Sequence, residues 1–133
     1  MKGVKYIDIK KVIEPDGTLV VMESEKQIPF EIKRIFVVKD VADGKSRGDH
    51  ATKKTKLILF PVTGSCDVVV DNGKEKETYK LNDTSKGLYI EEMIWRSMKD
   101  FSKDCALMAV CDRPFEAGNE TYDDYSEFIK ALG

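Results

Sequence analysis

Apolar and polar positions follow a short-strand pattern along most of the chain. Val4 to Ile9 alternates between the two classes, as a strand with one buried face does. Leu57 to Val62 is apolar throughout, which is typical of a strand covered on both faces. Further strand-like segments are Thr18 to Met22, Phe30 to Val38, Cys66 to Val70, Lys74 to Leu81, Leu88 to Arg96 and Cys105 to Cys111. The pattern predicts a chain built mainly from short β-strands.

Turn signals separate these segments. Pro15-Asp16-Gly17, Asp43-Gly44 and Thr63-Gly64 each combine residues that favour turns. Asp71-Asn72-Gly73 predicts a β-hairpin with a type I′ turn, because Asn-Gly accepts the positive φ values of that turn. Pro61 lacks a backbone N–H, so we expect it at a sheet edge, a bulge or a strand end.

Only the C-terminal segment changes its period. From Thr121 to Leu132, apolar residues recur at steps of three and four, which predicts one helix. Asn119 or Thr121 is expected to cap this helix. Many short strands followed by one helix predict an all-β sandwich or barrel whose edge or mouth the helix covers.

The composition fits one compact domain over residues 1–133 and argues against several functions. Twenty-two Lys and Arg against 24 Asp and Glu give a net charge of −2, without the strongly basic face typical of nucleic-acid binding. No apolar run reaches the roughly 18 residues of a membrane span, and the N-terminus lacks the apolar core of a signal peptide. The three cysteines have no CxxC spacing, so we expect reduced, mostly buried thiols in a cytoplasmic protein.

The segment Arg47 to Lys54 carries His50, the only histidine of the chain. Histidine has an unperturbed pKa close to 7, so it is the expected base for proton chemistry at neutral pH. Residues two apart share a face of an extended segment, which directs His50 and Thr52 into one cavity and Asp49 and Ala51 away from it. A base and a neighbouring hydroxyl then face the same ligand.

Metals and cofactors are not expected. Metal sites of this kind gather several imidazoles, whereas this chain has one, and a site made from His50 with Glu91 or Glu92 is not favoured. Neither a GxGxxG nor a GxxxxGKS/T loop is present to hold a dinucleotide or ATP. No cysteine has a histidine close in sequence, so a thiol nucleophile is not expected either. The sequence predicts cofactor-free chemistry.

Arg47-Gly48-Asp49-His50-Ala51 occurs with further motifs in a fixed order: Ile28 to Arg34, Val62 to Gly73, Lys86 to Arg96 and Tyr122 to Tyr125. In order and spacing they resemble the nucleotide-sugar 3,4-ketoisomerases, in which the first motif reads Arg-Gly-X-His-Ala-His-Lys. The resemblance covers nearly the whole chain. It implies an all-β, cupin-type jelly-roll barrel with a short C-terminal helix, and a homodimer that exchanges N-terminal strands.

The resemblance also implies an isomerase of deoxysugar biosynthesis acting on dTDP-4-keto-6-deoxyglucose, a dTDP-linked 4-keto-6-deoxyhexose. This reaction moves the carbonyl from C4 to C3 through an enediol. His50 matches the family histidine that moves the carbon-bound proton. Thr52 stands where the family has a second histidine, which passes protons between the sugar oxygens. Either Thr52 orients a water for that step, or Tyr89 or a carboxylate such as Asp49 takes it over.

A nucleotide-sugar carries a diphosphate, which predicts a local basic pocket. Arg34, Arg47 and Arg96 are the expected arginines, because a guanidinium pairs with two phosphate oxygens. Lys53 adjoins the histidine motif and is a further candidate. Trp95 is a candidate for stacking on the base or the sugar ring.

Two other functions stay open from the sequence. One is a sugar-nucleotide epimerase of the related jelly-roll type, which depends on a histidine–aspartate pair and a tyrosine acid such as Tyr89. The other is a dTDP-sugar-binding protein without turnover, because Thr52 cannot titrate near neutral pH. An isomerase with His50 as its base is the function that the sequence favours.

Overall fold

The computed structural model describes residues 1–133 and consists of strands with one C-terminal helix. The helix, α1, spans Tyr125–Leu132. The strands are β1 (Val4–Asp8), β2 (Lys10–Glu14), β3 (Gly17–Val21), β4 (Arg34–Lys39), β5 (Arg47–Thr52), β6 (Leu57–Thr63), β7 (Cys66–Asp71), β8 (Lys76–Leu81), β9 (Lys86–Ile90), β10 (Trp95–Lys99), β11 (Ala106–Cys111) and β12 (Thr121–Tyr122).

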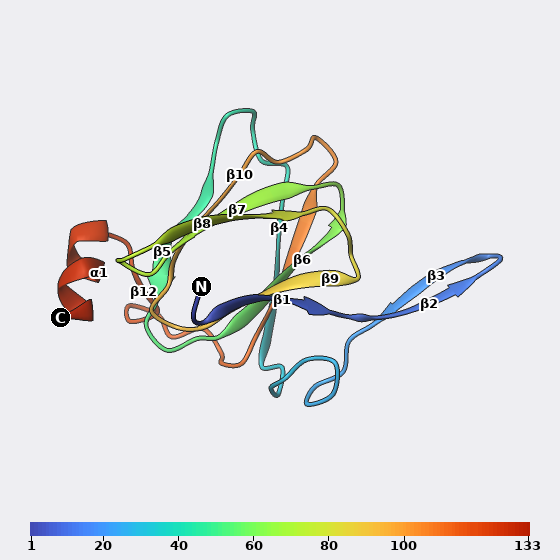
Figure 1. Cartoon of the computed structure of the whole chain (residues 1–133), viewed down its shortest axis with the longest axis horizontal. Helices are drawn as coiled ribbons and strands as arrows, with labels where there is room; N and C mark the ends of the chain where they lie inside the picture. Colours follow the sequence, from blue (N-terminus) through green and yellow to red (C-terminus); the bar gives the residue numbers. More distant parts are fainter.

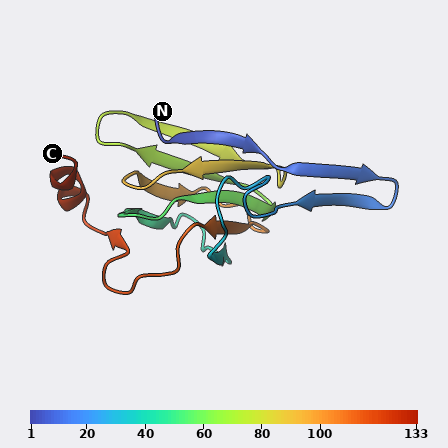
Figure 2. The same cartoon turned by 90° about the horizontal axis from the view of Figure 1, so that it is seen from below.

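Two five-stranded antiparallel sheets form the body of the protein, in the orders β1-β9-β6-β11-β4 and β12-β5-β10-β7-β8. They lie as two layers, with α1 at one end and the β2–β3 hairpin projecting from the other (Figures 1 and 2). The predicted all-β fold with a short C-terminal helix is therefore confirmed. The two sheets remain separate ladders, so the barrel is open rather than continuously hydrogen-bonded.

The main hydrophobic core lies between the two sheets, and a second cluster covers the outer face of the first sheet. β6 supplies both: Leu57 and Leu59 belong to the inner core, while Ile58 and Phe60 belong to the outer cluster. This explains why its sequence is apolar at successive positions. The outer cluster is closed by buried Ile28 and by partly buried residues between 20 and 32.

The two sheets meet along one side and part along the other. On the closed side, the Tyr6 hydroxyl of β1 donates to the Lys80 carbonyl of β8 at 3.0 Å, and the Tyr6 ring packs edge-on against Tyr79. On the other side, residues of edge strand β4, of β5 and of the short β12 surround one cavity. This open side is where a ligand can reach the space between the sheets.

Pro61 lies at a bulge, as its missing N–H predicts. The register of β6 against β11 shifts there: Pro61 pairs with Leu107, and Thr63 pairs with Ala106. β9 pairs with β6 only as far as Leu59. Pro61 therefore has no partner in β9 to which a backbone N–H would have to donate.

Several predicted boundaries are wrong. Leu88 to Arg96 forms two strands rather than one, because the chain turns at Met93, whose φ is +60°. The hairpin at Asn72-Gly73 exists, but its loop spans residues 72–75, since Asp71 pairs with Lys76. The segment Lys10–Glu14 is an unpredicted strand that pairs with β3.

The C-terminal helix begins later than predicted, because Thr121 and Tyr122 pair with β5 instead of joining it. Asp124 is its cap, and its carboxylate accepts hydrogen bonds from the backbone N–H groups of Ser126 and Glu127. The three cysteines are free and buried, as expected. No helix is long and apolar enough to cross a membrane.

Candidate active site

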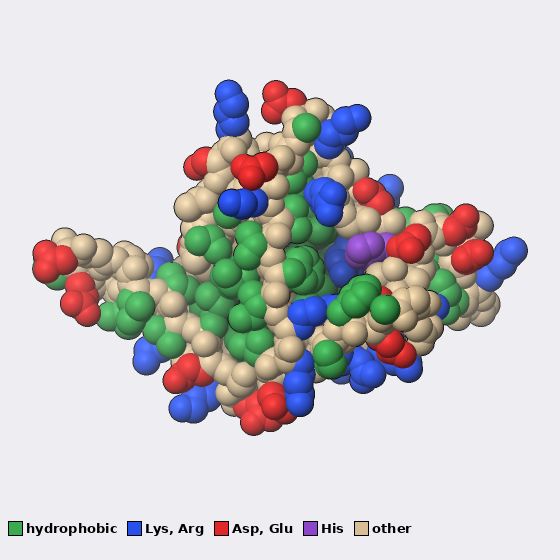
Figure 3. Space-filling view, turned by 180° about the vertical axis from the view of Figure 1, so that it is seen from behind, with side chains coloured by type: hydrophobic (Ala, Val, Ile, Leu, Met, Phe, Trp, Pro, Cys, Tyr) green, Lys and Arg blue, Asp and Glu red, His purple; other side chains and the backbone are tan.

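A cavity of about 560 Å³ opens between β4 and β5, and the only histidine lies in it. Figure 3 shows this histidine in a hollow of the surface, between acidic and basic side chains. The cavity is lined by Arg34, Phe36, His50, Thr52, Arg96, Phe115, Gly118, Asn119, Glu120, Thr121 and Asp123. Three strands and the segment before α1 therefore build one pocket.

Strand register directs His50 into this pocket. In the β5–β10 ladder His50 lies opposite Arg96, and both line the cavity, whereas Ala51 lies opposite Trp95 on the other face. The register shifts next to Arg96, where Gly48 and Asp49 adopt positive φ values. The predicted shared direction of His50 and Thr52 is confirmed.

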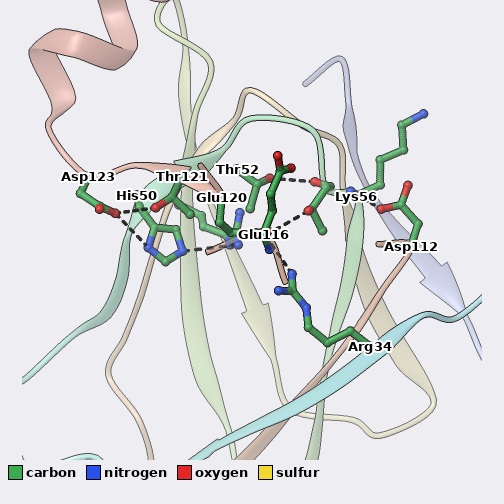
Figure 4. A network of polar contacts seen from close by, with 11 residues as sticks. Arg34, His50, Thr52, Lys56, Asp112, Glu116, Glu120, Thr121 and Asp123 are labelled. Atoms are coloured by element: carbon green, nitrogen blue, oxygen red, sulfur yellow. Dashed lines mark hydrogen bonds and ion pairs between the residues drawn. The ribbon is translucent and has the colours of Figure 1, made fainter. Parts of the chain in front are cut away.

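His50 is held between a cation and an anion. Its Nε2 lies 3.5 Å from Nη2 of Arg96, and its Nδ1 lies 3.8 Å from Oδ1 of Asp123 (Figure 4). Burial lowers the pKa of His50 to about 4, with the charge of Arg96 acting in the same direction and Asp123 opposing it. The imidazole is therefore neutral at pH 7 and free to accept a proton.

Arg96 is a buried cation without a full set of partners. Its side chain is 3% exposed, and its Nη1 makes no hydrogen bond. Burial lowers its pKa to about 10, so it remains charged at neutral pH. A buried N–H without an acceptor costs free energy, so Arg96 is held in this place at a cost to stability.

Thr52 is buried, and its hydroxyl donates to the backbone carbonyl of Thr55 at 2.7 Å. A hydroxyl has one hydrogen and two acceptor lone pairs. Because the hydrogen is committed to Thr55, Thr52 offers acceptor capacity to the cavity.

Glu120 connects several parts of the wall, a role that no pattern in the sequence indicates. Its Oε2 accepts from Arg34 Nη2 at 2.9 Å and from the Thr55 hydroxyl at 3.0 Å, and its Oε1 accepts from the backbone N–H of Glu116 at 3.2 Å (Figure 4). Burial alone would raise the pKa of Glu120, but the hydrogen bonds from Arg34, Glu116 and Thr55 outweigh it and lower the pKa.

Two of the predicted binding residues line the pocket and one lies at its rim. Arg34 lies in the wall, with the Phe115 ring 5.7 Å from its guanidinium carbon. Arg96 lies beside His50. Lys53 donates to Asn119 at 3.0 Å and covers the Tyr122 ring, which keeps its ammonium at the edge of the cavity.

The structure corrects the expected placement of Tyr89 and Trp95. Leu88 and Ile90 belong to the core between the sheets, so Tyr89 points to the opposite face, where it packs against the outer cluster. Trp95 alternates with Arg96 in the same way and packs edge-on against Tyr125 of α1. Neither side chain reaches His50 within this chain.

Arg47 and Asp49 also lie outside the His50 cavity. Arg47 lines a second cavity, of about 550 Å³, formed where β4 ends and β5 begins. Asp49 accepts hydrogen bonds from the hydroxyls of Ser46 at 2.8 Å and Ser97 at 2.7 Å. Its carboxylate is thus engaged away from the predicted proton shuttle.

An open β-sandwich with one neutral imidazole beside a buried guanidinium defines a site suited to proton transfer next to developing negative charge. Known proteins are similar to this chain over nearly its whole length. The family model described as FdtA, WxcM-like, C-terminal matches residues 2–133. The chain is 35% identical over 130 residues to the TDP-4-oxo-6-deoxy-α-D-glucose-3,4-oxoisomerase of Aneurinibacillus thermoaerophilus, covering 96% of this chain and 94% of that protein.

Solved structures show the same likeness. WlaRA, a TDP-fucose-3,4-ketoisomerase from Campylobacter jejuni, superposes with a TM-score of 0.91 at 35% identity, covering 100% of this chain and 97% of that one. A histidine-to-asparagine mutant of the 3,4-ketoisomerase QdtA from Thermoanaerobacterium thermosaccharolyticum, crystallised with TDP-4-keto-6-deoxyglucose, gives a TM-score of 0.95 at 29% identity, covering 98% of this chain and 94% of that one. The chain belongs to the FdtA, WxcM-like family, and the predicted isomerase class is confirmed.

Proposed function

We propose that this protein converts dTDP-4-keto-6-deoxyglucose into a dTDP-3-keto-6-deoxyhexose, with His50 as the base. The observation that carries the proposal is the placement of His50, whose imidazole faces a buried cation in a cavity of about 560 Å³. It is supported by the 35% identity of the chain to a 3,4-oxoisomerase. The epimerase alternative has less support, because a curated relative and a solved structure, each 35% identical to this chain, are 3,4-ketoisomerases. Binding without turnover is the remaining alternative, and proton NMR with the sugar nucleotide distinguishes it.

The reaction begins with removal of the hydrogen on C3, which is acidic because it lies next to the C4 ketone. His50 takes this proton, the C–H electrons form a C3–C4 double bond, and the C4 carbonyl oxygen becomes an enediolate oxygen. Arg96 stabilises this oxygen through an N–H of its guanidinium, because Arg96 lines the cavity beside Nε2 of His50. One such donor is worth about 3 kcal/mol in a water-poor site.

The second half restores a ketone at C3. The proton on the C3 oxygen passes to the C4 oxygen, the C3 carbonyl forms, and C4 receives the proton held by His50. Thr52 holds a water for the transfer between oxygens, since its hydroxyl presents lone pairs to the cavity. The atoms balance without an oxidant or a cofactor.

The nucleotide runs along the opening between β4 and β5 in this proposal. The cavities with His50 and with Arg47 follow one another there, the first beside the start of β4 and the second beside its end. Arg34 and Lys53 supply positive charge at the first cavity and Arg47 supplies it at the second. The diphosphate would meet these cations because guanidinium and ammonium groups both bind phosphate oxygens.

Proton NMR of the purified protein with dTDP-4-keto-6-deoxyglucose in deuterium oxide tests the reaction. We expect the 3-keto product with deuterium incorporated from solvent, and no product with His50→Asn. A Thr52→His variant tests the shuttle, because an imidazole there transfers protons directly. Binding of dTDP by all three proteins without any turnover would establish the non-catalytic alternative instead.

We also propose a cytoplasmic homodimer in which the β2–β3 hairpin packs on a second copy. The hairpin stands away from the body, and its Ile13 and Leu19 side chains are 71% and 60% exposed (Figure 2). Edge strand β4 offers an apolar outer face, with Ile35 and Val37 exposed. Free, buried cysteines fit the reducing cytoplasm.

Sedimentation of the chain and of the Ile13→Asp and Leu19→Asp variants tests the dimer. We expect the wild-type chain to sediment as a dimer and both variants as monomers, because a charge on a buried apolar contact opposes association. Leu132→Asp is the matched control on α1, far from the hairpin, and should leave the dimer intact. A monomeric wild-type chain would refute the proposed exchange.

A further inference from the structure

The nitrogen of His50 that carries its hydrogen can be derived from its neighbours. Arg96 approaches Nε2 at 3.5 Å, and a guanidinium has donors only. Nε2 must therefore present a lone pair. A neutral imidazole carries one hydrogen, so it sits on Nδ1, which faces Oδ1 of Asp123 at 3.8 Å.

The carboxylate of Asp123 is held in this position by the fold. In the β12–β5 ladder, Thr121 lies opposite Thr52 and Tyr122 opposite Ala51, so the next residue along the chain arrives beside His50. The Thr121 hydroxyl donates at 2.7 Å to Oδ1 of Asp123, the same oxygen that faces Nδ1 (Figure 4). The pairing of β12 with β5 thus delivers an acceptor to one ring nitrogen while β10 delivers a donor to the other.

We propose that Asp123 is a positioning residue that holds His50 in the Nδ1–H tautomer, so that Nε2 is the nitrogen that acts as the base. The chemical benefit rests on the proposed function: a base nitrogen beside Arg96 lies next to the oxygen on which negative charge develops. Asp123 also favours the imidazolium that forms when Nε2 takes the C3 proton. The charged groups around this ring are Arg96, Asp123, Asp49 and Glu120.

The single histidine makes the tautomer directly measurable. Long-range proton–nitrogen NMR of the ¹⁵N-labelled, untagged chain at pH 7 gives one pair of imidazole nitrogens. We expect Nδ1 to show the shift of a protonated nitrogen and Nε2 that of a lone-pair nitrogen. In Asp123→Ala the two shifts should move toward each other as both tautomers become populated. A protonated Nε2 in the wild-type chain, or an unchanged spectrum in Asp123→Ala, would overturn the proposal.

Asp124→Asn is the matched control. It removes the same charge one residue away, where the side chain caps α1 and does not touch His50, and asparagine caps helices as well as aspartate does. It should keep the wild-type nitrogen shifts and turnover. If Asp124→Asn changed the shifts as much as Asp123→Ala, a general charge effect would replace the specific role.

Kinetics supply the second measurement. Asp123→Ala should lower kcat about tenfold and change KM little, since the Asp123 side chain is 79% exposed and acts only through the base. Asp123→Asn should recover part of the loss, because an amide oxygen in the place of Oδ1 still presents an acceptor to Nδ1–H. An unchanged kcat in Asp123→Ala would contradict the proposal. Absence of isomerase activity in every protein, wild type included, would refute the proposed function while the NMR result still decided the role of Asp123.

Discussion

The Thr52 hydroxyl donates to the Thr55 carbonyl at 2.7 Å, so the residue in the second histidine's place faces the cavity as an acceptor. We predict that Thr52→Val folds but turns over substrate about tenfold more slowly, because the bound water loses its anchor. Stability should fall by about 1 kcal/mol, the usual net worth of a hydrogen bond. Denaturant titration and kcat measure the two effects.

Thr63→Val is the control for this change. The Thr63 hydroxyl also donates to a backbone carbonyl, that of Asp104 at 2.6 Å, but it lies outside the cavity. The Thr63→Val variant should lose about as much stability as Thr52→Val and keep the kcat of the wild type. Equal kcat values for the two variants would show that the Thr52 hydroxyl has no role in turnover.

The depressed pKa of His50 predicts how stability depends on pH. The pKa is about 4 in the folded chain against 6.5 for the ordinary side chain, so the unfolded chain binds more protons between these values. The contribution of neutral His50 to stability is complete above pH 6.5 and is lost as the pH falls toward 4. Between pH 7.5 and pH 5 the wild-type chain should lose about 2 kcal/mol more than His50→Asn, which has no histidine to titrate. Parallel pH profiles for both proteins would contradict this.

Much of this arrangement could be predicted from local patterns. The apolar run Leu57 to Val62 identified the strand that is covered on both faces, and alternation along β5 placed His50 and Thr52 together. Alternation along β9 also predicts the observed direction of Tyr89. Its neighbours Leu88 and Ile90 fill the core, so Tyr89 must point to the opposite face.

Glu120 and Asp123 could not be predicted in this way. Glu120 precedes any strand or helix period, and Asp123 lies in the stretch predicted as the first turn of the helix. Both reach the cavity only because β12 pairs with β5. This contact joins residues about 70 positions apart in the chain, and turn and periodicity signals carry no information on such pairings.

Glu120 predicts a separate effect on substrate affinity. Glu120→Ala leaves Arg34 and the Thr55 hydroxyl without their shared acceptor, so stability should fall by about 2 kcal/mol. KM should rise about tenfold because Arg34 is no longer held in place, with a smaller change in kcat. Thermal unfolding and steady-state kinetics measure both.

Glu116→Gln is the control on the same segment. Its side chain accepts only from Asn119, and glutamine retains an acceptor oxygen for that contact. Its KM should match that of the wild type. A kcat loss larger than the KM change in Glu120→Ala would instead assign Glu120 to the chemical step.

Replacing Arg96 should separate activity from stability. Arg96 is a buried cation with an unpaired N–H, and an apolar side chain of similar volume in such a place is often neutral or stabilising. Arg96→Met should therefore fold at least as stably as the wild type, yet lose on the order of 100-fold in kcat because the enediolate oxygen loses its donor. Burial would still lower the pKa of His50, but the pKa should rise above its wild-type value once the neighbouring positive charge is gone, and a histidine NMR titration measures this.

Arg113→Met is the control for this change, because Arg113 is exposed and lies outside the cavity. It should change neither kcat nor the pKa of His50. Full activity in Arg96→Met would remove Arg96 from the mechanism and leave His50 without an electrophilic partner.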